Sequence, residues 1–165
     1  DRSSFYRGEI DKYSWQTIGS SYLLSDILAA KLFSQFEELD LITKTRIKIW
    51  NNYYDQFSEL EKSGKVKRPT LPKYAQHNGH IFYLLCNNHQ ERNGLIEYLK
   101  IEKIYSSFHY LSLHNSHYFY GKYKGEPLIN SIKYSNCLIR LPIFPMLDLA
   151  SQNKIIDRIY NFFTN

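Results

Sequence analysis

The sequence predicts an α/β fold in which two long helices lead into a small sheet with helices packed on it. Apolar residues recur at helical spacing over residues 22–39 and again over residues 41–63. A short, almost continuous apolar run at residues 80–86 has the length of a buried strand, and a helical pattern follows it at once. With 165 residues and 43% hydrophobic content, the chain can bury a substantial core.

The two long helices are defined by their apolar rows and by their ends. Residues 1–18 mix aromatic and charged side chains without a sustained period, so we expect an irregular segment there. The first helix has one apolar face, which we expect to be buried. The residues of that face are Leu24, Leu28, Leu32 and Phe36. The second helix has an aromatic stripe made of Ile42, Ile49, Trp50, Tyr53, Tyr54, Phe57 and Leu60. Gly64 is placed to end it as a C′ residue.

The middle of the chain predicts a strand, a helix and a second strand. A loop over residues 64–79 leads into the strand at residues 80–86. Asn88 is a suitable N-cap for a helix over about residues 89–100. We interpret residues 104–111 as the next strand, so that the three elements form an α/β unit.

The C-terminal third predicts a loop, a helix, an extended segment and a final helix. Residues 114–127 form a polar, aromatic loop, and a helix follows over about residues 128–137. Residues 138–144 are extended, and the proline at position 142 favours the edge of a sheet. The apolar residues of 150–163 recur at the spacing of an amphipathic helix.

Composition narrows the class of protein. The net charge of +5 permits an anionic partner without requiring one. A basic run formed by Lys62, Lys65, Lys67 and Arg68 is explained by a helix end and a polar connector, so we expect no nucleic-acid binding. Cys86 and Cys137 lie in apolar runs, and we interpret both as reduced core residues. No apolar run approaches a membrane span, so we expect a cytoplasmic protein.

Few residue patterns point to chemistry. The six histidines have no cysteine or carboxylate at ligand spacing, so we expect no metal site. The sequence has neither a Gly-x-Ser-x-Gly elbow nor a Walker A loop. His109, Tyr110 and His114 lie at the end of the predicted strand, where the chain enters a loop, and can donate to phosphate or sugar hydroxyls, but a structural histidine pair is an equal alternative. The Gly19–Ser21 turn can contact an anion, although a helix capped by Ser25 also explains it.

Four segments together resemble the C-terminal part of the DegT/DnrJ/EryC1/StrS family of pyridoxal-phosphate-dependent sugar aminotransferases. The most specific evidence is the occurrence together of two motifs, Arg7-Gly8-Glu9-Ile10-Asp11-Lys12-Tyr13-Ser14-Trp15 and Gly19-Ser20-Ser21-Tyr22. The other two segments are Phe108-His109-Tyr110 with Leu113-His114, and Leu138-Ile139-Arg140-Leu141-Pro142-Ile143-Phe144. Within the family, the chain is most similar to the subgroup that makes dTDP-4-amino-4,6-dideoxygalactose. The resemblance covers nearly all of the chain but only the latter part of such an enzyme.

The resemblance implies a fold-type I aminotransferase that works as a homodimer with shared active sites. It implies that the cofactor, pyridoxal 5'-phosphate, forms a Schiff base with a lysine of an upstream domain. The Ser107-Phe108-His109 segment imitates the start of the family's lysine motif, but no lysine follows it before Lys122. We therefore expect no catalytic residue within this chain and no turnover by the chain alone.

The resemblance also implies roles for individual residues. Gly19, Ser20, Ser21 and Tyr22 match the loop that reaches the cofactor phosphate across the dimer, with Ser21 in the place of the usual Asn. Substrate contacts are expected from Arg7, Lys12, His109, Tyr110 and His114. Leu23 replaces a family arginine, and Ser112 replaces a family proline. Residues 117–126 depart most from the family pattern and are expected to alter substrate choice.

The predicted organisation has three parts. Residues 1–40 end the large-domain region and carry the cofactor loop, residues 41–64 form the spine helix, and residues 65–165 form a small α/β domain. The expected reaction moves an amino group from glutamate to dTDP-4-keto-6-deoxy-D-glucose, for surface polysaccharide such as lipopolysaccharide and enterobacterial common antigen. The alternatives are a non-enzymatic nucleotide-sugar-binding module and one subunit of a split enzyme.

Overall fold

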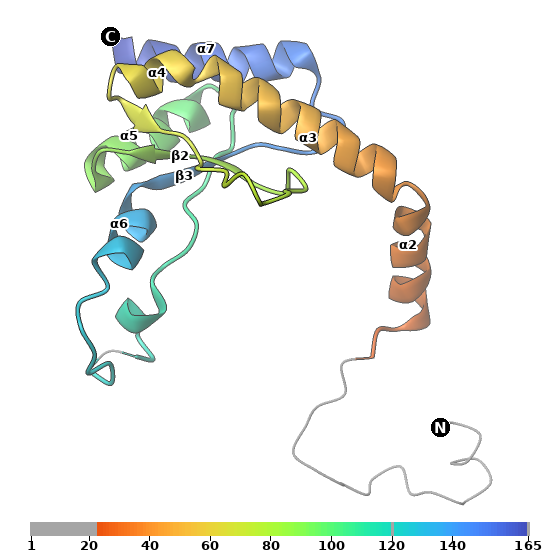
Figure 1. Cartoon of the computed structure of the whole chain (residues 1–165), viewed down its shortest axis with the longest axis horizontal. Helices are drawn as coiled ribbons and strands as arrows, with labels where there is room; N and C mark the ends of the chain where they lie inside the picture. Colours follow the sequence, from red (N-terminus) through yellow and green to blue (C-terminus); the bar gives the residue numbers. More distant parts are fainter. Residues whose placement is uncertain (1–22, 120, 165) are drawn as a thin grey trace, which may run out of the picture. The chain divides into compact units, whose positions relative to one another are not determined.

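A computed structural model describes residues 23–119 and 121–164. The chain divides into two units, and the boundary in the sequence lies between Glu37 and Glu38. In the first unit the described part contains one helix, α2 (Asp26–Glu37). The second unit contains α3 (Leu39–Gln56), α4 (Ser58–Lys62), β1 (Val66–Lys67), β2 (Phe82–Cys86), α5 (His89–Ile101), the 3₁₀ turn η1 (Leu113–Asn115), α6 (Ile129–Cys137), β3 (Leu138–Leu141) and α7 (Leu149–Thr164) (Figure 1).

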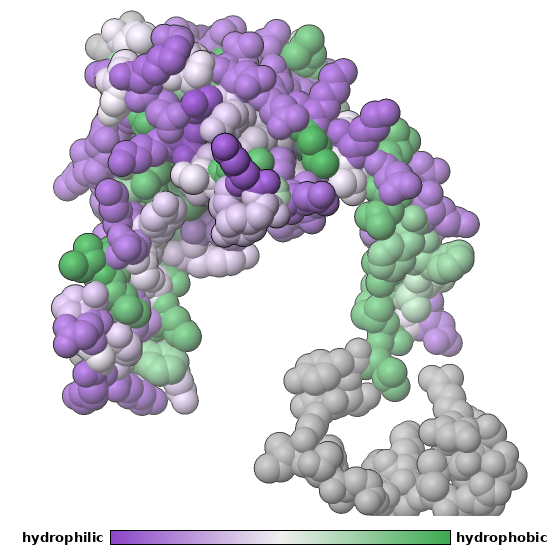
Figure 2. Space-filling model, in the orientation of Figure 1, coloured by the Kyte–Doolittle hydropathy of each residue, from purple (hydrophilic) through white to green (hydrophobic). Residues whose placement is uncertain are grey.

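Helix α2 begins as expected, but its apolar face is not buried. The backbone N–H of Leu28 donates to Ser25 Oγ at 3.4 Å, so Ser25 caps the helix as predicted. The expected burial of the row at Leu24, Leu28, Leu32 and Phe36 is wrong for the described chain, because all four are exposed. Helix α2 is the one described element of its unit, so no described neighbour within the unit covers it. Figure 2 shows the hydrophobic side chains gathered along this helix.

The predicted helix over residues 41–63 forms as two helices that meet at Phe57. The N–H of Phe57 still donates to the carbonyl of Tyr53, and that of Glu61 donates to Phe57, so hydrogen bonds span the break. The aromatic stripe is confirmed, since Trp50, Tyr53 and Phe57 are buried. Gly64 ends α4 with a φ of +74°, which confirms the predicted left-handed C′ residue.

The three strands form one antiparallel sheet in the order β1-β2-β3. Strand β2 and the helix α5 that follows it are confirmed, and Asn88 Oδ1 caps α5 by accepting from the N–H of Glu91 at 2.8 Å. Strand β3 lies at the edge of the sheet, directly before Pro142, as predicted. Strand β1 is a correction, because it lies within the predicted loop over residues 64–79.

The predicted strand over residues 104–111 is wrong. That segment makes one isolated bridge, in which Ser107 pairs with Arg140 of β3. Most of its apolar side chains are exposed, among them Tyr105, Tyr110 and Leu111, so the apolar run reflects surface rather than core. The expected strand–helix–strand unit is therefore replaced by the antiparallel pairing of β2 with β3.

The sheet buries one face more deeply than the other. Phe82, Leu84 and Cys86 of β2 join the main core with residues of α3, α5 and α7. On the other face, Leu85 packs with Cys137 and Leu138, next to α6. Cys86 and Cys137 are buried free thiols, as predicted. Figure 1 shows α3 and α7 side by side over the sheet, and residues of the two helices are in contact.

Candidate functional site

Six of the residues expected to contact cofactor or substrate lie outside the described residues. They are Arg7, Lys12, Gly19, Ser20, Ser21 and Tyr22. The described chain begins at residue 23, just before α2, and Ser25 caps the N-terminus of that helix. The expected roles of the six residues therefore stay predictions.

His109 lies beside a guanidinium group. Its Nδ1 is 3.1 Å from Nη1 of Arg140. Because a guanidinium can only donate, Nδ1 of His109 accepts this hydrogen bond and the ring is neutral, with its proton on Nε2. Burial lowers the pKa of His109, and the positive charge of Arg140 and the neighbouring His80 lower it further. His109 is thus placed as an acceptor that orients Arg140.

Tyr110 and His114 have different surroundings. The ring of Tyr110 lies 3.8 Å from that of His109, centroid to centroid, and its side chain is largely exposed. His114 lies in η1, and its ring packs against Tyr123 at 5.5 Å. The structure therefore places His109 and Tyr110 together, whereas His114 packs on the following loop.

Ser112 ties this loop to α6. Its side chain is buried, and its hydroxyl donates to the carbonyl of Ser131 at 3.0 Å. The hydroxyl of Ser131 donates back to Ser112 Oγ at 3.1 Å. Two side-chain hydrogen bonds thus anchor the loop to α6.

A hollow at the end of the sheet gathers two arginines and a histidine from three parts of the second unit. It is lined by Arg46, His80, Tyr105, Ser107, Arg140, Leu141, Pro142 and Ile143. Arg46 comes from α3, His80 from the segment before β2, and Arg140 from β3. Arg46 donates from Nε to the carbonyl of Gly79 at 3.2 Å and from Nη2 to that of His80 at 2.6 Å.

Arg46, His80 and Arg140 were not predicted as a site. The three residues come together only through tertiary structure, so no local spacing marks them. The one usable signal was an arginine inside the apolar run Leu138–Leu141, since a charged residue in a buried strand needs a partner or a function.

Two described arginines outside the hollow have acidic partners, in contrast to those that line it. Arg68 pairs with Glu61 at 2.7 Å, and Arg158 pairs with Glu102 at 3.0 Å. Arg46 and Arg140 have no carboxylate within 4.0 Å among residues 23–119 and 121–164. The hollow therefore carries a net positive charge within the described part of the chain, which suits an anion.

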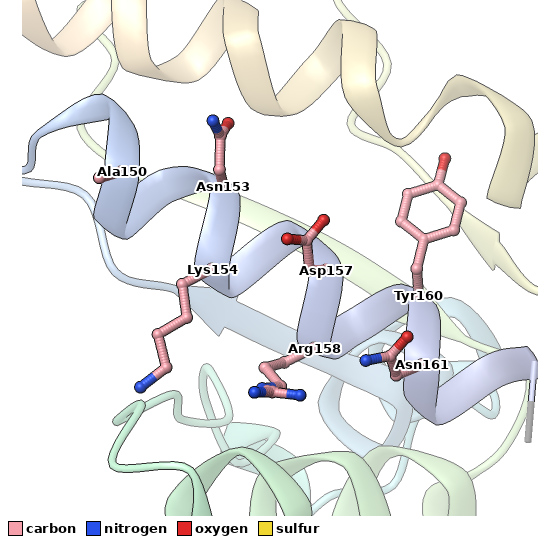
Figure 3. A pocket seen from close by; sticks show the side chains of 7 residues that line it. All are labelled: Ala150, Asn153, Lys154, Asp157, Arg158, Tyr160 and Asn161. Carbon is pink, nitrogen blue, oxygen red and sulfur yellow. The ribbon is translucent and has the colours of Figure 1, made fainter.

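A different hollow runs along the outer surface of α7 (Figure 3). Figure 3 shows Asn153, Asp157 and Tyr160 pointing toward α3, while Lys154 and Arg158 point toward α5. The hydroxyl of Tyr160 donates to the carbonyl of Gln56 at 2.7 Å. Because Arg158 is also paired with Glu102, these side chains join α7 to its neighbours, and we assign them no chemical role.

Residues 23–119 and 121–164 contain no group of three or more His, Cys, Asp or Glu side chains arranged to hold a metal ion. None of the described helices has the length and the hydrophobicity needed to span a membrane.

The chain is similar to aminotransferases. A model of the DegT/DnrJ/EryC1/StrS aminotransferase family matches residues 2–160. The uncharacterized protein MJ1066 of Methanocaldococcus jannaschii is 33% identical over 145 residues, which are 84% of this chain and 36% of that protein. A DegT DnrJ EryC1 StrS aminotransferase from Brucella abortus is 27% identical, with a TM-score of 0.78 over 99% of this chain and 43% of its own.

A third match includes the cofactor. The PLP-form of Spr1654, a proposed sugar aminotransferase of Streptococcus pneumoniae, is 18% identical, with a TM-score of 0.73 over 92% of this chain and 39% of its own. These similarities confirm the predicted fold class, the C-terminal α/β portion of a fold-type I aminotransferase. The chain spans 36% to 43% of the length of the three proteins.

Proposed function

This chain belongs to the DegT/DnrJ/EryC1/StrS aminotransferase family, and we propose that it is the C-terminal part of an enzyme that aminates a nucleotide sugar. The match of residues 2–160 to the family carries the proposal. The amino donor is glutamate and the acceptor is dTDP-4-keto-6-deoxy-D-glucose. The paired segments at Arg7–Trp15 and Gly19–Tyr22 support the subgroup whose product is dTDP-4-amino-4,6-dideoxygalactose, used for lipopolysaccharide and enterobacterial common antigen.

Pyridoxal 5'-phosphate, when bound, supplies the electron sink that amino transfer requires. In the proposal, the loop at Gly19–Tyr22 holds its phosphate across a homodimer interface. Ser20, Ser21 and Tyr22 each carry a hydroxyl that can donate to a phosphate oxygen, so the donor set fits the group. Ser21 has a shorter reach than the usual Asn. Ser25 caps the start of α2, which begins shortly after this segment in the sequence.

The remaining candidate residues bind and orient the sugar nucleotide in this proposal. Arg7 and Lys12 supply cations for its phosphates. His109 keeps its proton on Nε2 because Nδ1 accepts from Arg140, so Nε2 is the atom that can donate to an oxygen. The phenol of the exposed Tyr110 is also available, while His114 contributes through the loop that it packs.

The three-part organisation belongs to the same proposal. Residues 1–40 end the large-domain region, residues 41–64 are the spine, and residues 65–165 form the small domain. The buried aromatic side chains of α3, and Phe57 between α3 and α4, support the spine role, because they contact both the sheet and α7. For example, Phe57 stacks on Tyr160 of α7 at 6.3 Å and lies 6.1 Å from Phe82 of β2.

The cofactor-binding lysine lies upstream of these residues in the proposal, so the chain alone does not turn over. The test is to load the natural gene product with pyridoxal 5'-phosphate, reduce it with borohydride and locate the labelled lysine by mass spectrometry. We expect the label outside the 165 residues. A pyridoxyl-lysine at any of the chain's own lysines would overturn the proposal.

The same experiment addresses the alternatives. A label carried by a separately encoded polypeptide that co-purifies with this chain identifies a split enzyme. A gene product that binds the sugar nucleotide but acquires no label identifies a non-enzymatic binding module.

A further inference from the structure

We propose that Arg46 and Arg140 form a binding site for a single oxyanion group, a carboxylate or a phosphate, and that His109 positions Arg140 within it. The site is the hollow at the end of the sheet, which His80, Tyr105 and Ser107 also line. Its existence does not depend on the proposed amino transfer. Only the source of the oxyanion, the amino donor or the sugar nucleotide, rests on that function.

The backbone of Arg140 is held on both sides. Within the sheet, Arg140 lies opposite Tyr83 of β2, while its neighbours Ile139 and Leu141 belong to the main core. Because side chains alternate along a strand, the guanidinium points away from that core. On the outer edge, the N–H of Arg140 donates to the carbonyl of Ser107 at 2.7 Å. The backbone from which the Arg140 side chain extends is therefore fixed on both sides.

The guanidinium of Arg140 has only one described protein partner. Its Nη1 donates to His109 Nδ1 at 3.1 Å, which uses one of five N–H groups. A guanidinium fork can contact both oxygens of a carboxylate or two oxygens of a phosphate. The bond to His109 leaves such a fork available and sets its direction, so His109 is a positioning residue.

The second guanidinium is fixed by backbone carbonyls. Arg46 donates from Nε and Nη2 to Gly79 and His80. Gly79 approaches α3 so closely that a Cβ built on it would be 2.7 Å from the carbonyl carbon of Arg46. Carbonyl oxygens orient a guanidinium without neutralising it, so Arg46 keeps its full charge. The charge is thus held in place before any anion arrives, which lowers the entropic cost of binding.

The charge and size of the hollow select the ligand group. No described carboxylate lies within 4.0 Å of either guanidinium, whereas Arg68 and Arg158 both have one. An anion would relieve the repulsion between the two cations. The hollow has a volume of about 200 Å³, below the several hundred Å³ typical of sites that enclose a whole cofactor-sized ligand. It therefore accommodates one charged group rather than an entire nucleotide sugar.

The first experiment measures anion binding to the 165-residue chain at constant ionic strength. The probes are inorganic phosphate and glutarate, a dicarboxylate without an amine, titrated by calorimetry. Arg140→Gln is expected to weaken binding at least about tenfold, because it removes charge-assisted hydrogen bonds. Arg140→Lys, which keeps the charge but loses the fork, is expected to fall between Arg140→Gln and the unaltered chain. Circular dichroism verifies that both variants fold.

The matched control is Lys44→Gln. Lys44 is exposed, lies two positions before Arg46 on α3 and lines a different surface, so this variant removes the same charge without touching the hollow. We expect less than about a twofold change in affinity for it. Equal weakening by Lys44→Gln and Arg140→Gln, or the absence of saturable binding for both probes, would overturn the site.

The positioning role of His109 has its own pair of variants. Asn at position 109 offers an acceptor oxygen near the place of Nδ1, and Leu offers none. We expect His109→Asn to bind phosphate within about twofold of the unaltered chain, and His109→Leu to bind it several-fold more weakly. The same affinity for the two variants would refute a role through Arg140.

Steady-state kinetics of the natural gene product then identify the source of the oxyanion. If Arg140→Gln raises the KM for glutamate alone, the site takes the carboxylate of the amino donor. If it raises the KM for the dTDP-sugar alone, the site takes a phosphate. An active enzyme with neither change contradicts the site. If the natural gene product shows no amino transfer, the proposed function is wrong. The binding experiments still test the anion site in that case.

Discussion

Replacing Gly79 by alanine tests how the segment before β2 is held against α3. Gly79 is buried and has a φ of +63°, a left-handed conformation that an L side chain adopts only at a cost. A Cβ there would lie 2.7 Å from the carbonyl carbon of Arg46, 2.8 Å from its oxygen and 2.9 Å from the nitrogen of Ile47. All three are backbone atoms of a helix, so they cannot move aside as a flexible side chain would.

The expected cost of Gly79→Ala has two parts. The positive φ contributes about 1 kcal/mol. Forcing a methyl group into backbone contact adds about 1 to 3 kcal/mol, by analogy with overpacked cores. The total loss of unfolding free energy is then about 2 to 4 kcal/mol. With a urea m-value of about 2 kcal/mol/M, the unfolding midpoint falls by about 1 to 2 M.

The assay is urea unfolding of the 165-residue chain, followed by circular dichroism. The matched control is Gly64→Ala, because Gly64 has a φ of +74° but no atom within 4 Å of its built Cβ. The control should lose only about 1 kcal/mol. The difference between the two variants isolates the steric part. If Gly79→Ala costs no more than Gly64→Ala, the close approach of Gly79 to α3 is wrong.

Three further predictions address the capping, electrostatics and burial of single residues. Asn88→Ala removes the side chain that caps α5 through the N–H of Glu91, so urea unfolding should show a loss of about 1 kcal/mol. NMR titration should give His109 a pKa below its ordinary 6.5, and Arg140→Gln should move that pKa upward. Because the pKa of His109 is lower in the folded chain than in the unfolded chain, its contribution to the free energy of unfolding is full above about pH 6.5. This contribution declines as the pH falls below that value. A measured pKa at or above 6.5 would contradict the His109–Arg140 contact. Burial raises the pKa of Cys86 to about 12, so iodoacetamide should modify it far more slowly in the folded chain than in urea, as measured by mass spectrometry.

Features set by neighbouring residues could be predicted from the sequence. The helix after Asn88 was predicted because its cap and apolar spacing are local, and the end of α4 was predicted because Gly64 suits a left-handed residue. Strand β2 was predicted because its apolar run has polar residues on both sides. The two-residue strand β1 is too short to show any periodicity, so its pairing with β2 left no signal.

Features set by tertiary partners could not be predicted. The run from Ile104 to Leu111 looks like a strand, but a strand requires a partner along its length, and only Ser107 pairs with Arg140. The cationic hollow depends on three elements that are distant in sequence and on backbone carbonyls that any residue would provide. His109 was predicted as a substrate contact from its motif, but its hydrogen bond to Arg140 appears only in the fold.

The most direct test of the account is isotope transfer by the natural gene product that contains this chain. The enzyme is loaded with pyridoxal 5'-phosphate and given [¹⁵N]glutamate and dTDP-4-keto-6-deoxy-D-glucose, and the sugar nucleotide is analysed by mass spectrometry. The account predicts one ¹⁵N atom in a dTDP-4-amino-4,6-dideoxyhexose. A cofactor-loaded protein that leaves the dTDP-sugar unlabelled would contradict it.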